Sequence, residues 1–292
     1  MREDGTGNAG GVVVLGPVSW NEILLVDALP EARPHTVFAE ASYETLGGTS
    51  AGKALHLTDL GVAVGLRTPV GDDRHGRQVL DALATAGVAP HVLAPAGPTE
   101  HHVNVMTASG ARLSIYATPP ADTTATVTAD DLAGARALVL DLAPWTQRLA
   151  VELGRRDRDH GPAVWTDLHD TDGSDPWRQP FIDAATHVLC SDDSLADPLG
   201  FLHHVVDGGA AVAVCTLGAQ GAVAVDADHR EWRVSAHPVE QVVDTNGAGD
   251  AFFAGVLAAT LDGADLPAAL DAGARQATRA LESRHLSPLL GI

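Results

Sequence analysis

The chain has 292 residues, of which 45% are hydrophobic, and 38 acidic against 18 basic residues give a formal net charge of −20. This composition predicts a folded globular protein of one large domain or two, with a substantial core. The charge argues against nucleic acid and against an anionic membrane as partners. The polar first ten residues do not resemble a signal peptide and no apolar run approaches the roughly 20 residues of a membrane span, so we expect a cytoplasmic protein. Cys190 and Cys215 both end apolar strand-like runs, which favours small buried hydrophobic residues over a disulfide or metal pair.

Apolar runs along the chain predict strands and helices that alternate. The first half indicates strands at 12–16, 36–44 and 61–67, a helix at 78–86 capped by Asp73 or Arg74, and strands at 99–107 and 111–117 around the hairpin signal Ser109-Gly110. From residue 135, strands at 137–141, 163–167, 186–190, 210–216, 222–225 and 231–234 alternate with helices at 145–156, 177–184 and 198–206. This order predicts an α/β fold with a mostly parallel sheet covered on both faces. Segments 23–26 and 37–43 could join the hairpin in a small separate sheet.

Polar residues gather where the predicted strands end. With Gly16 they are Asp141, Asp167, Ser191, Thr216 and Asp244. Ligands of open α/β sheets bind at the carboxyl ends of the strands, so this pattern predicts a site at that edge. Each residue alone could be only a turn residue or a helix cap.

The most informative stretch is 244–255, Asp-Thr-Asn-Gly-Ala-Gly-Asp-Ala-Phe-Phe-Ala-Gly. A strand-like approach at Val242-Val243 leads into a glycine-rich turn, and a proline-free helix is expected over 251–261. The free N–H groups and the dipole of a helix start favour an anion, and glycines let a phosphate approach the backbone. Asp250 at this place suits a base that takes a proton from an attacking hydroxyl. The alternative is a turn with an ordinary first-turn acid, because short glycine motifs often match by chance.

The same stretch resembles the C-terminal signature of the ribokinase-like (PfkB) carbohydrate kinases. The resemblance implies a three-layer α/β/α sandwich with a small β-sheet lid, the core being 1–16, 45–98 and 119–292 and the lid 17–44 and 99–118. It also implies transfer of the γ-phosphate of ATP, with Mg²⁺ and possibly K⁺, to a hydroxyl of a sugar, sugar acid or nucleoside. By this resemblance Asp250 is the catalytic base and the backbone of Gly247, Ala248 and Gly249 forms the anion hole. Asp244 and Ser283 would line the monovalent-cation loop.

The resemblance extends to the nucleotide side of the site. Residues 216–221, Thr-Leu-Gly-Ala-Gln-Gly, are similar to the family's phosphate loop T-L-G-x-x-G. The nucleotide contacts that the resemblance implies are Thr216, Gly218, Gly221, Asn246, Gly273 and Ala277, the last two on a helix that would flank the adenine. Ser191-Asp192-Asp193-Ser194 stands where the family has N-x-x-E, and neither the Asn nor the Glu is present. Asp193 or Asp192 could replace them through water, because Mg²⁺ keeps several waters.

The acceptor side is implied by a second group of residues. Asn21 stands where the family carries an Asp that holds sugar hydroxyls, and an amide can still donate and accept hydrogen bonds. Gly47 and Gly48 match the family's N-terminal Gly-Gly motif, and Asp167 lies in a segment near the pocket. His102 and Asn104 lie on the hairpin of the expected lid. An adjacent His101-His102 metal pair is disfavoured because neighbouring strand residues point to opposite faces.

Residues 47–53 also contain Gly-x-x-x-x-Gly-Lys, the core of a P-loop. The next residue is Ala54, where a P-loop needs Ser or Thr to bind Mg²⁺, and this argues against a P-loop NTPase. Lys53 is the only lysine in the chain. It could hold substrate or phosphate, or it could be a solvent-exposed lysine on a helix.

Three functions compete on this basis. The first is an ATP-dependent kinase, the second is a catalytically impaired nucleotide- or metabolite-binding member of the same fold, and the third is a P-loop NTPase. The altered N-x-x-E segment and Asn21 motivate the second, whereas Asp250 favours the first. An exposed lid edge also invites a homodimer.

Overall fold

The computed structural model describes residues 10–107, 110–132, 134–156 and 161–291. Its largest element is a sheet built from β1 (Val12–Leu15), β4 (Val64–Pro69), β5 (His91–Leu93), β8 (Ala137–Leu140), β9 (Ala163–Asp167), β10 (His187–Ser191), β11 (Val212–Thr216), β12 (Ala222–Asp226) and β13 (Glu231–Val234). The nine strands lie in the order β13-β12-β11-β10-β9-β8-β1-β4-β5. From β11 to β5 all neighbours are parallel, and β12 pairs antiparallel with both β11 and β13. The predicted mostly parallel sheet is therefore confirmed.

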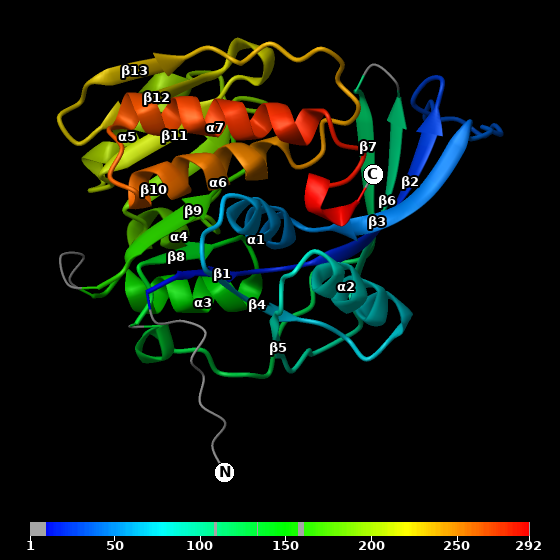
Figure 1. Ribbon diagram of the computed structural model, residues 1–292, viewed down its shortest axis with the longest axis horizontal. Coiled ribbons are helices and arrows are strands. Elements are labelled where there is room, and N and C mark those ends of the chain that lie inside the picture. The colour runs from blue at the N-terminus through cyan, green and yellow to red at the C-terminus, as the bar shows by residue number, and fades with distance from the viewer. Residues whose placement is uncertain (1–9, 108–109, 133, 157–160, 292) are drawn as a thin grey trace.

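Helices cover both faces of this sheet, as the apolar strand sequences require. All four residues of β1 are fully buried, with Val12 and Val14 in one hydrophobic cluster and Val13 and Leu15 in the other. The first cluster lies under α1 (Thr49–Asp59), α2 (Arg74–Thr85), α6 (Ala248–Leu261) and α7 (Leu266–Leu281), and the second under α3 (Pro144–Leu153), α4 (Gln179–Ala184) and α5 (Pro198–Asp207). Short 3₁₀ turns are η1 (Ala129–Leu132), η2 (Gly218–Gln220) and η3 (Pro288–Leu290). This is the three-layer α/β/α arrangement (Figure 1).

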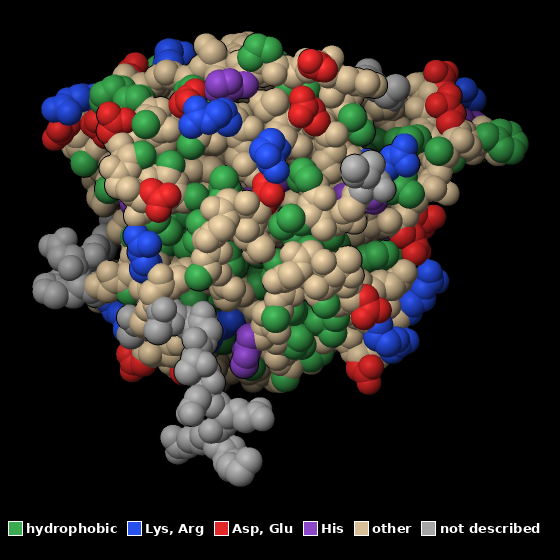
Figure 2. Space-filling model, viewed as in Figure 1, with side chains coloured by type: hydrophobic (Ala, Val, Ile, Leu, Met, Phe, Trp, Pro, Cys, Tyr) green, Lys and Arg blue, Asp and Glu red, His purple; other side chains and the backbone are tan. Residues whose placement is uncertain are grey.

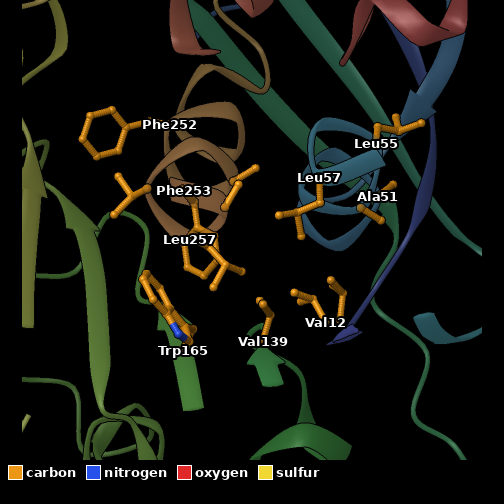
Figure 3. Packing of buried hydrophobic residues seen from close by; sticks show 14 of the residues in the cluster. Val12, Ala51, Leu55, Leu57, Val139, Trp165, Phe252, Phe253 and Leu257 are labelled. Carbon is orange, nitrogen blue, oxygen red and sulfur yellow. The ribbon is translucent and has the colours of Figure 1, made fainter. Parts of the chain in front are cut away.

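Helices α1 and α6 lie side by side on the first face and bring distant parts of the chain together. Figure 3 shows Leu57 of α1 with Phe253 and Leu257 of α6 above Val139 and Trp165 of the sheet. Close packing of this layer continues to α7, where a Cβ on Gly255 would lie 2.8 Å from the Cα of Gly273. The apolar packing therefore fixes the two helix starts that meet at the carboxyl edge of the sheet.

A second, four-stranded sheet lies at one end of the main sheet (Figure 1). It consists of β2 (Ser19–Val26), β3 (Ala41–Gly47), β6 (Glu100–Thr107) and β7 (Arg112–Thr118) in the order β3-β2-β6-β7, and β2 and β6 are parallel. Asn21 pairs in register with Thr45 and His102, and Ile23 pairs with Asn104. Paired residues point to the same side of a sheet, so Asn21, His102 and Asn104 share one face.

Several predicted boundaries are wrong. The strand expected at 36–44 begins only at Ala41, where pairing with Leu25 starts, and it continues to Gly47. The strand-like approach at Val242-Val243 is irregular backbone that pairs with none of the described strands, and both side chains are about half exposed. Asp73 caps α2 as predicted, since its carboxylate accepts from the N–H of Gly76. The tip of the predicted hairpin, Ser109, lies outside the described residues.

The surface carries the acidic charge of the composition. On the face drawn in Figure 2, basic and acidic side chains are scattered among one another. Among the residues that the structure describes, no helix combines the length and the apolar character needed to cross a bilayer. Cys190 and Cys215 are buried and unbonded, on neighbouring strands, as the sequence predicts.

Candidate active site

The start of α6 forms the centre of the site. Gly247 precedes the helix with φ 78°, a left-handed conformation that favours glycine, and a Cβ there would lie 2.8 Å from Leu286. No side chain caps this helix start, which lies wholly within the described residues. A Cβ on Gly249 would meet nothing within 4 Å, so the first turn is open on that side. Uncapped amides and open space together leave room for an anion.

Asp250 lies in this first turn and is held through one of its two oxygens. Oδ1 accepts hydrogen bonds from Thr49 Oγ1 at 2.6 Å and from Lys53 Nζ at 2.9 Å. Oδ2 faces Gly52, where an added Cβ would lie only 2.6 Å away. The side chain is 13% exposed. The absence of a side chain at Gly52 therefore lets α1 approach the carboxylate of Asp250 closely.

Lys53 joins Asp250 to two further carboxylates. Its Nζ lies 2.9 Å from Asp141 Oδ1 and 3.2 Å from Asp167 Oδ2, and the side chain is fully buried. Asp141 follows β8, and Asp167 ends β9. The four charged groups thus come from α1, α6 and the ends of two neighbouring strands. They meet at the carboxyl edge of the sheet, where the sequence predicts a ligand site.

Burial and the ion pairs oppose each other in this cluster. Burial lowers the pKa of Lys53, but the charges of Asp141, Asp250 and Asp167 outweigh it and hold that pKa above its ordinary value. Burial raises the pKa of the Asp141 carboxyl above its usual range despite the nearby ammonium. Burial acts in the same direction on Asp167, yet His169 and Lys53 together hold the pKa of that carboxyl below its usual value. Lys53 is therefore a fixed positive charge among acids.

The inner face of the small sheet contacts the loop that leads into α6. Tyr43 of β3 donates to Asp244 Oδ2 at 3.2 Å, and Arg112 of β7 donates to Asn246 Oδ1 at 2.5 Å. On the same face His102 is bonded through Nε2 to Glu100 Oε1 at 2.6 Å. Asn21 accepts a hydrogen bond from Ser19. His101 points to the other face and stacks on His75, with ring centroids 4.3 Å apart.

The loops after β10 and β11 form the other half of the site. Thr216 ends β11, and its carbonyl accepts from the N–H of Asp192 at 3.1 Å, so the two loops are adjacent. Gly218 and Gly221 both have positive φ, and a Cβ on Gly221 would lie 2.0 Å from the carbonyl oxygen of Val234. Asp193 is exposed and accepts from Ser191 Oγ at 2.9 Å. A tight turn that is closed by its own backbone hydrogen bonds therefore lies next to the loop of this exposed carboxylate.

Comparisons with known proteins found a matching family model and several similar proteins. The family model of the pfkB family carbohydrate kinases matches residues 183–288. Acarbose 7(IV)-phosphotransferase of Actinoplanes sp. is 31% identical over 270 residues, which cover 90% of this chain and 89% of that protein. The chain belongs to the PfkB family of carbohydrate kinases. It is thus a phosphotransferase with an alcohol group as acceptor.

Two further comparisons place this kinase among its relatives. Ribokinase of Bacillus subtilis is 27% identical over 272 residues, covering 89% of this chain and 88% of that enzyme. The solved structure of Mak1, a microbiome-derived acarbose kinase, superposes with a TM-score of 0.79 at 29% identity and covers 94% of this chain and 93% of that one. The ribokinase-like fold predicted from the signature is therefore confirmed.

The structure corrects both expectations for Lys53. Gly48 is the N-cap of α1, so residues 49–52 are already helical and form no phosphate-binding loop. The Lys53 side chain is neither solvent-exposed nor open to a substrate, because it is fully buried against three carboxylates. The arrangement therefore contradicts a P-loop NTPase, in which this lysine would reach a phosphate.

The residues predicted to bind a cation or the nucleotide have different surroundings in the structure. Asp244 is buried, and its N–H lies 3.4 Å from the carbonyl oxygen of Leu281, close to the loop of Ser283. Asn246 turns toward the small sheet, since its Nδ2 contacts Met106 Sδ at 3.3 Å. Gly273 is buried against α6, and Ala277 is partly buried on the same helix. The roles of these five residues remain predictions.

Sequence reasoning missed the residues that hold the site residues in place. Thr49 on α1 anchors Asp250, Glu100 holds His102, and Tyr43 bonds Asp244. Of the residues that support the site, only Asp141 was indicated by the sequence, because it is a polar residue at the end of a predicted strand. Thr49 and Tyr43 each lie 201 residues from their partner in the chain, and no local pattern specifies such contacts, whereas Glu100 lies two residues from His102 on the same strand.

Proposed function

We propose that this kinase transfers the γ-phosphate of ATP to a hydroxyl of a sugar or sugar derivative bound between the small sheet and the carboxyl edge of the main sheet. Asp250 is the general base. It takes the proton of the acceptor hydroxyl through Oδ2, while the acceptor oxygen forms a bond to the γ-phosphorus and the bond to the leaving ADP oxygen breaks. The acceptor oxygen therefore loses its proton to Asp250 and gains the phosphoryl group from ATP. Such a base contributes about 10²–10⁴-fold to a rate.

The anion hole is the second part of the mechanism. The backbone N–H groups of Gly247, Ala248 and Gly249 are proposed to face the transferred phosphoryl group. The observation in favour is the uncapped helix start with open space at Gly249. Fixed donors at a place where charge develops stabilise a transition state, because they need no reorganisation during the reaction.

The acceptor is proposed to bind to the inner face of the small sheet. Asn21, His102 and Asn104 offer amide and imidazole groups on that face, and Gly47 and Gly48 lie beside them, with the side chain of Asn21 packed against Gly47. Asp167 adds a buried carboxylate at the floor. Neutral hydrogen-bonding groups and carboxylates of this kind suit vicinal sugar hydroxyls.

The nucleotide is proposed to lie over Thr216, Gly218 and Gly221. The exposed carboxylate of Asp193, next to the exposed Asp192, suits Mg²⁺, which binds through one or two carboxylates and otherwise keeps water and phosphate ligands. When bound, Mg²⁺ would neutralise charge on the phosphates. The described residues contain no cluster of three or more His, Cys, Asp or Glu side chains that could hold a metal by itself. A K⁺ ion near Asp244 and Ser283 remains part of the proposal.

One observation carries the proposal: Asp250 combines an anchored oxygen with a second oxygen that has no hydrogen-bond partner among the described residues, directly beside an open helix start. A binding protein without catalysis has no use for this arrangement. The catalytically impaired alternative therefore stands only on Asn21 and the altered segment at 191–194.

The test is a coupled ADP-release screen with MgATP over sugars, sugar acids, nucleosides and acarbose, which two of the relatives carry in their names. Wild-type protein should release ADP with one acceptor class, and Asp250→Asn should lower kcat by about 10²–10⁴-fold while still folding, as judged by circular dichroism. Equal turnover by Asp250→Asn would refute the assigned base. Absence of ADP release with every acceptor, together with tight nucleotide binding, would favour the impaired alternative.

A further inference from the structure

The only lysine of the chain is fully buried beneath the proposed base. Lysine is almost never buried without a specific partner, and here the ammonium contacts Asp141, Asp167 and Asp250. Nothing in the proposed reaction uses this group directly, because its side chain has no exposed surface. Its position therefore needs a separate explanation.

The two carboxylate oxygens of Asp250 have different surroundings. Oδ1 receives both hydrogen bonds, from Lys53 and from Thr49. Oδ2 receives none from the described residues and lies against the space left by Gly52. Thr49 also accepts a hydrogen bond from Lys53, so the three side chains form a closed triangle. The carboxylate plane is thereby fixed with one oxygen free.

The same ammonium keeps three carboxylates together. All three carboxylate oxygens contact one Nζ, so they lie within about 6 Å of one another, a separation at which like charges favour protonation. Without the positive charge, Asp250 would bind a proton more readily, and a protonated base cannot accept another proton. Asp167 belongs to the proposed acceptor floor, so Lys53 also links the base to the acceptor.

We propose that Lys53 is a positioning residue that keeps Asp250 ionised, aims its Oδ2 at the acceptor hydroxyl and ties it to Asp167. This inference rests on the proposed role of Asp250 as the base. Lys53 acts through Asp250 and touches neither substrate.

The test compares Lys53→Met, which removes the charge and keeps most of the volume, with Thr49→Val, which removes a neutral hydrogen bond to the same oxygen. The pH profiles of kcat and of kcat/KM for the acceptor are measured from pH 5.5 to 9.5, with KM for ATP alongside. Lys53→Met should lower kcat at pH 7 on the order of 10- to 100-fold, move the acidic limb to higher pH and recover part of the loss at pH 9. Thr49→Val should lower kcat a few-fold and move the acidic limb in the same direction by a smaller amount, because it removes a neutral hydrogen bond to the carboxylate and no charge. A Lys53→Met profile with the wild-type shape would overturn the inference, whether its rate is unchanged or uniformly lower.

Removing one partner of a buried ion cluster can prevent folding, so a second variant is required. Lys53→Met with Asp141→Asn removes one positive and one negative charge together and leaves Asp167 beside Asp250. It should fold, as judged by circular dichroism and thermal melting, and it should show the same displaced acidic limb. Failure of both variants to fold would assign Lys53 a purely structural role and overturn the inference.

Asp250→Asn, measured in the same series, separates the two proposals. If it turns over like the wild type, the assigned base fails, and the role of Lys53 fails with it. If Asp250→Asn is inactive while Lys53→Met keeps the wild-type pH profile, only the inference about Lys53 fails.

Discussion

The two halves of the site differ in how their polar groups are satisfied. In the half proposed to bind the acceptor (the acceptor half), the side chains of Lys53, Asp141, Asp167 and Asp250 are at most 13% exposed, and each carboxylate contacts the Lys53 ammonium. In the nucleotide half, Asp193 is exposed and bonds to its near neighbour Ser191. One half is closed by its own side chains, and the other presents open loops.

Burial explains this difference. A buried charge without a partner is costly, so the acceptor half must pair its groups before any ligand arrives. Exposed groups of the nucleotide half are paired with water at little cost and can exchange that water for phosphate or metal. We therefore expect substitutions in the acceptor half to change chemistry and stability, and substitutions in the nucleotide half to change mainly nucleotide binding.

The largest effects are expected where the two halves meet, at the start of α6. Gly247→Ala places a Cβ at positive φ and against Leu286, so it should cost about 1–3 kcal/mol of unfolding free energy. Gly249→Ala should leave the free energy of unfolding unchanged or slightly higher, because nothing lies within 4 Å, yet lower kcat about tenfold, since its methyl group enters the anion hole. Denaturant unfolding and steady-state kinetics measure the two effects.

This pair separates a structural glycine from a functional one within three residues. If Gly249→Ala kept wild-type kcat, the proposed phosphoryl position would lie elsewhere. If Gly247→Ala unfolded at the wild-type denaturant concentration, the helix start would be less constrained than its geometry indicates.

A smaller effect is expected on the inner face of the small sheet. Glu100 is buried, burial raises the pKa of its carboxyl, and it orients His102 through a 2.6 Å hydrogen bond. Glu100→Gln keeps the shape but weakens this bond by about 1 kcal/mol, so KM for the acceptor should rise about fivefold while KM for ATP stays the same. Glu22→Gln, on the opposite face of the same sheet, is the matched control and should change neither. Equal effects of both variants would show that His102 does not contact the acceptor.

The sequence predicts the local features of the proposed site better than its long-range contacts. The turn at 216–221 and the helix start at 247–250 are local features, because short runs of residues specify the turn, the glycines and the first-turn acid. The contacts of Lys53 are not local, since its three partners lie after β8, at the end of β9 and in α6. A lysine on a helix most often faces water, so the pattern of α1 alone gives no reason to expect burial.

Strand boundaries show the same limit within the fold. Strands β9 and β13 begin and end where the residue patterns predict, because the local sequence suffices there. The strand at 36–44 starts five residues late, since its true start is fixed by pairing with Leu25. Val242 and Val243 have strand-like side chains but pair with none of the strands in the described ranges. Propensity without a pairing partner does not make a strand.

The smallest effect is expected in the nucleotide half. Asp193→Asn removes one exposed charge beside Ser191, and exposed charges contribute about 0.2–1 kcal/mol, so KM for MgATP should rise about two- to threefold with kcat unchanged. Asp262→Asn, at the far end of α6, makes the same change in net charge away from the carboxyl edge and should leave KM unaltered. Raising the Mg²⁺ concentration should bring the KM for MgATP of Asp193→Asn closer to the wild-type value if this carboxylate holds the ion through water. A large loss of kcat instead would mean that Asp193 takes part in the chemistry, and the nucleotide half would then contribute to catalysis as directly as the acceptor half.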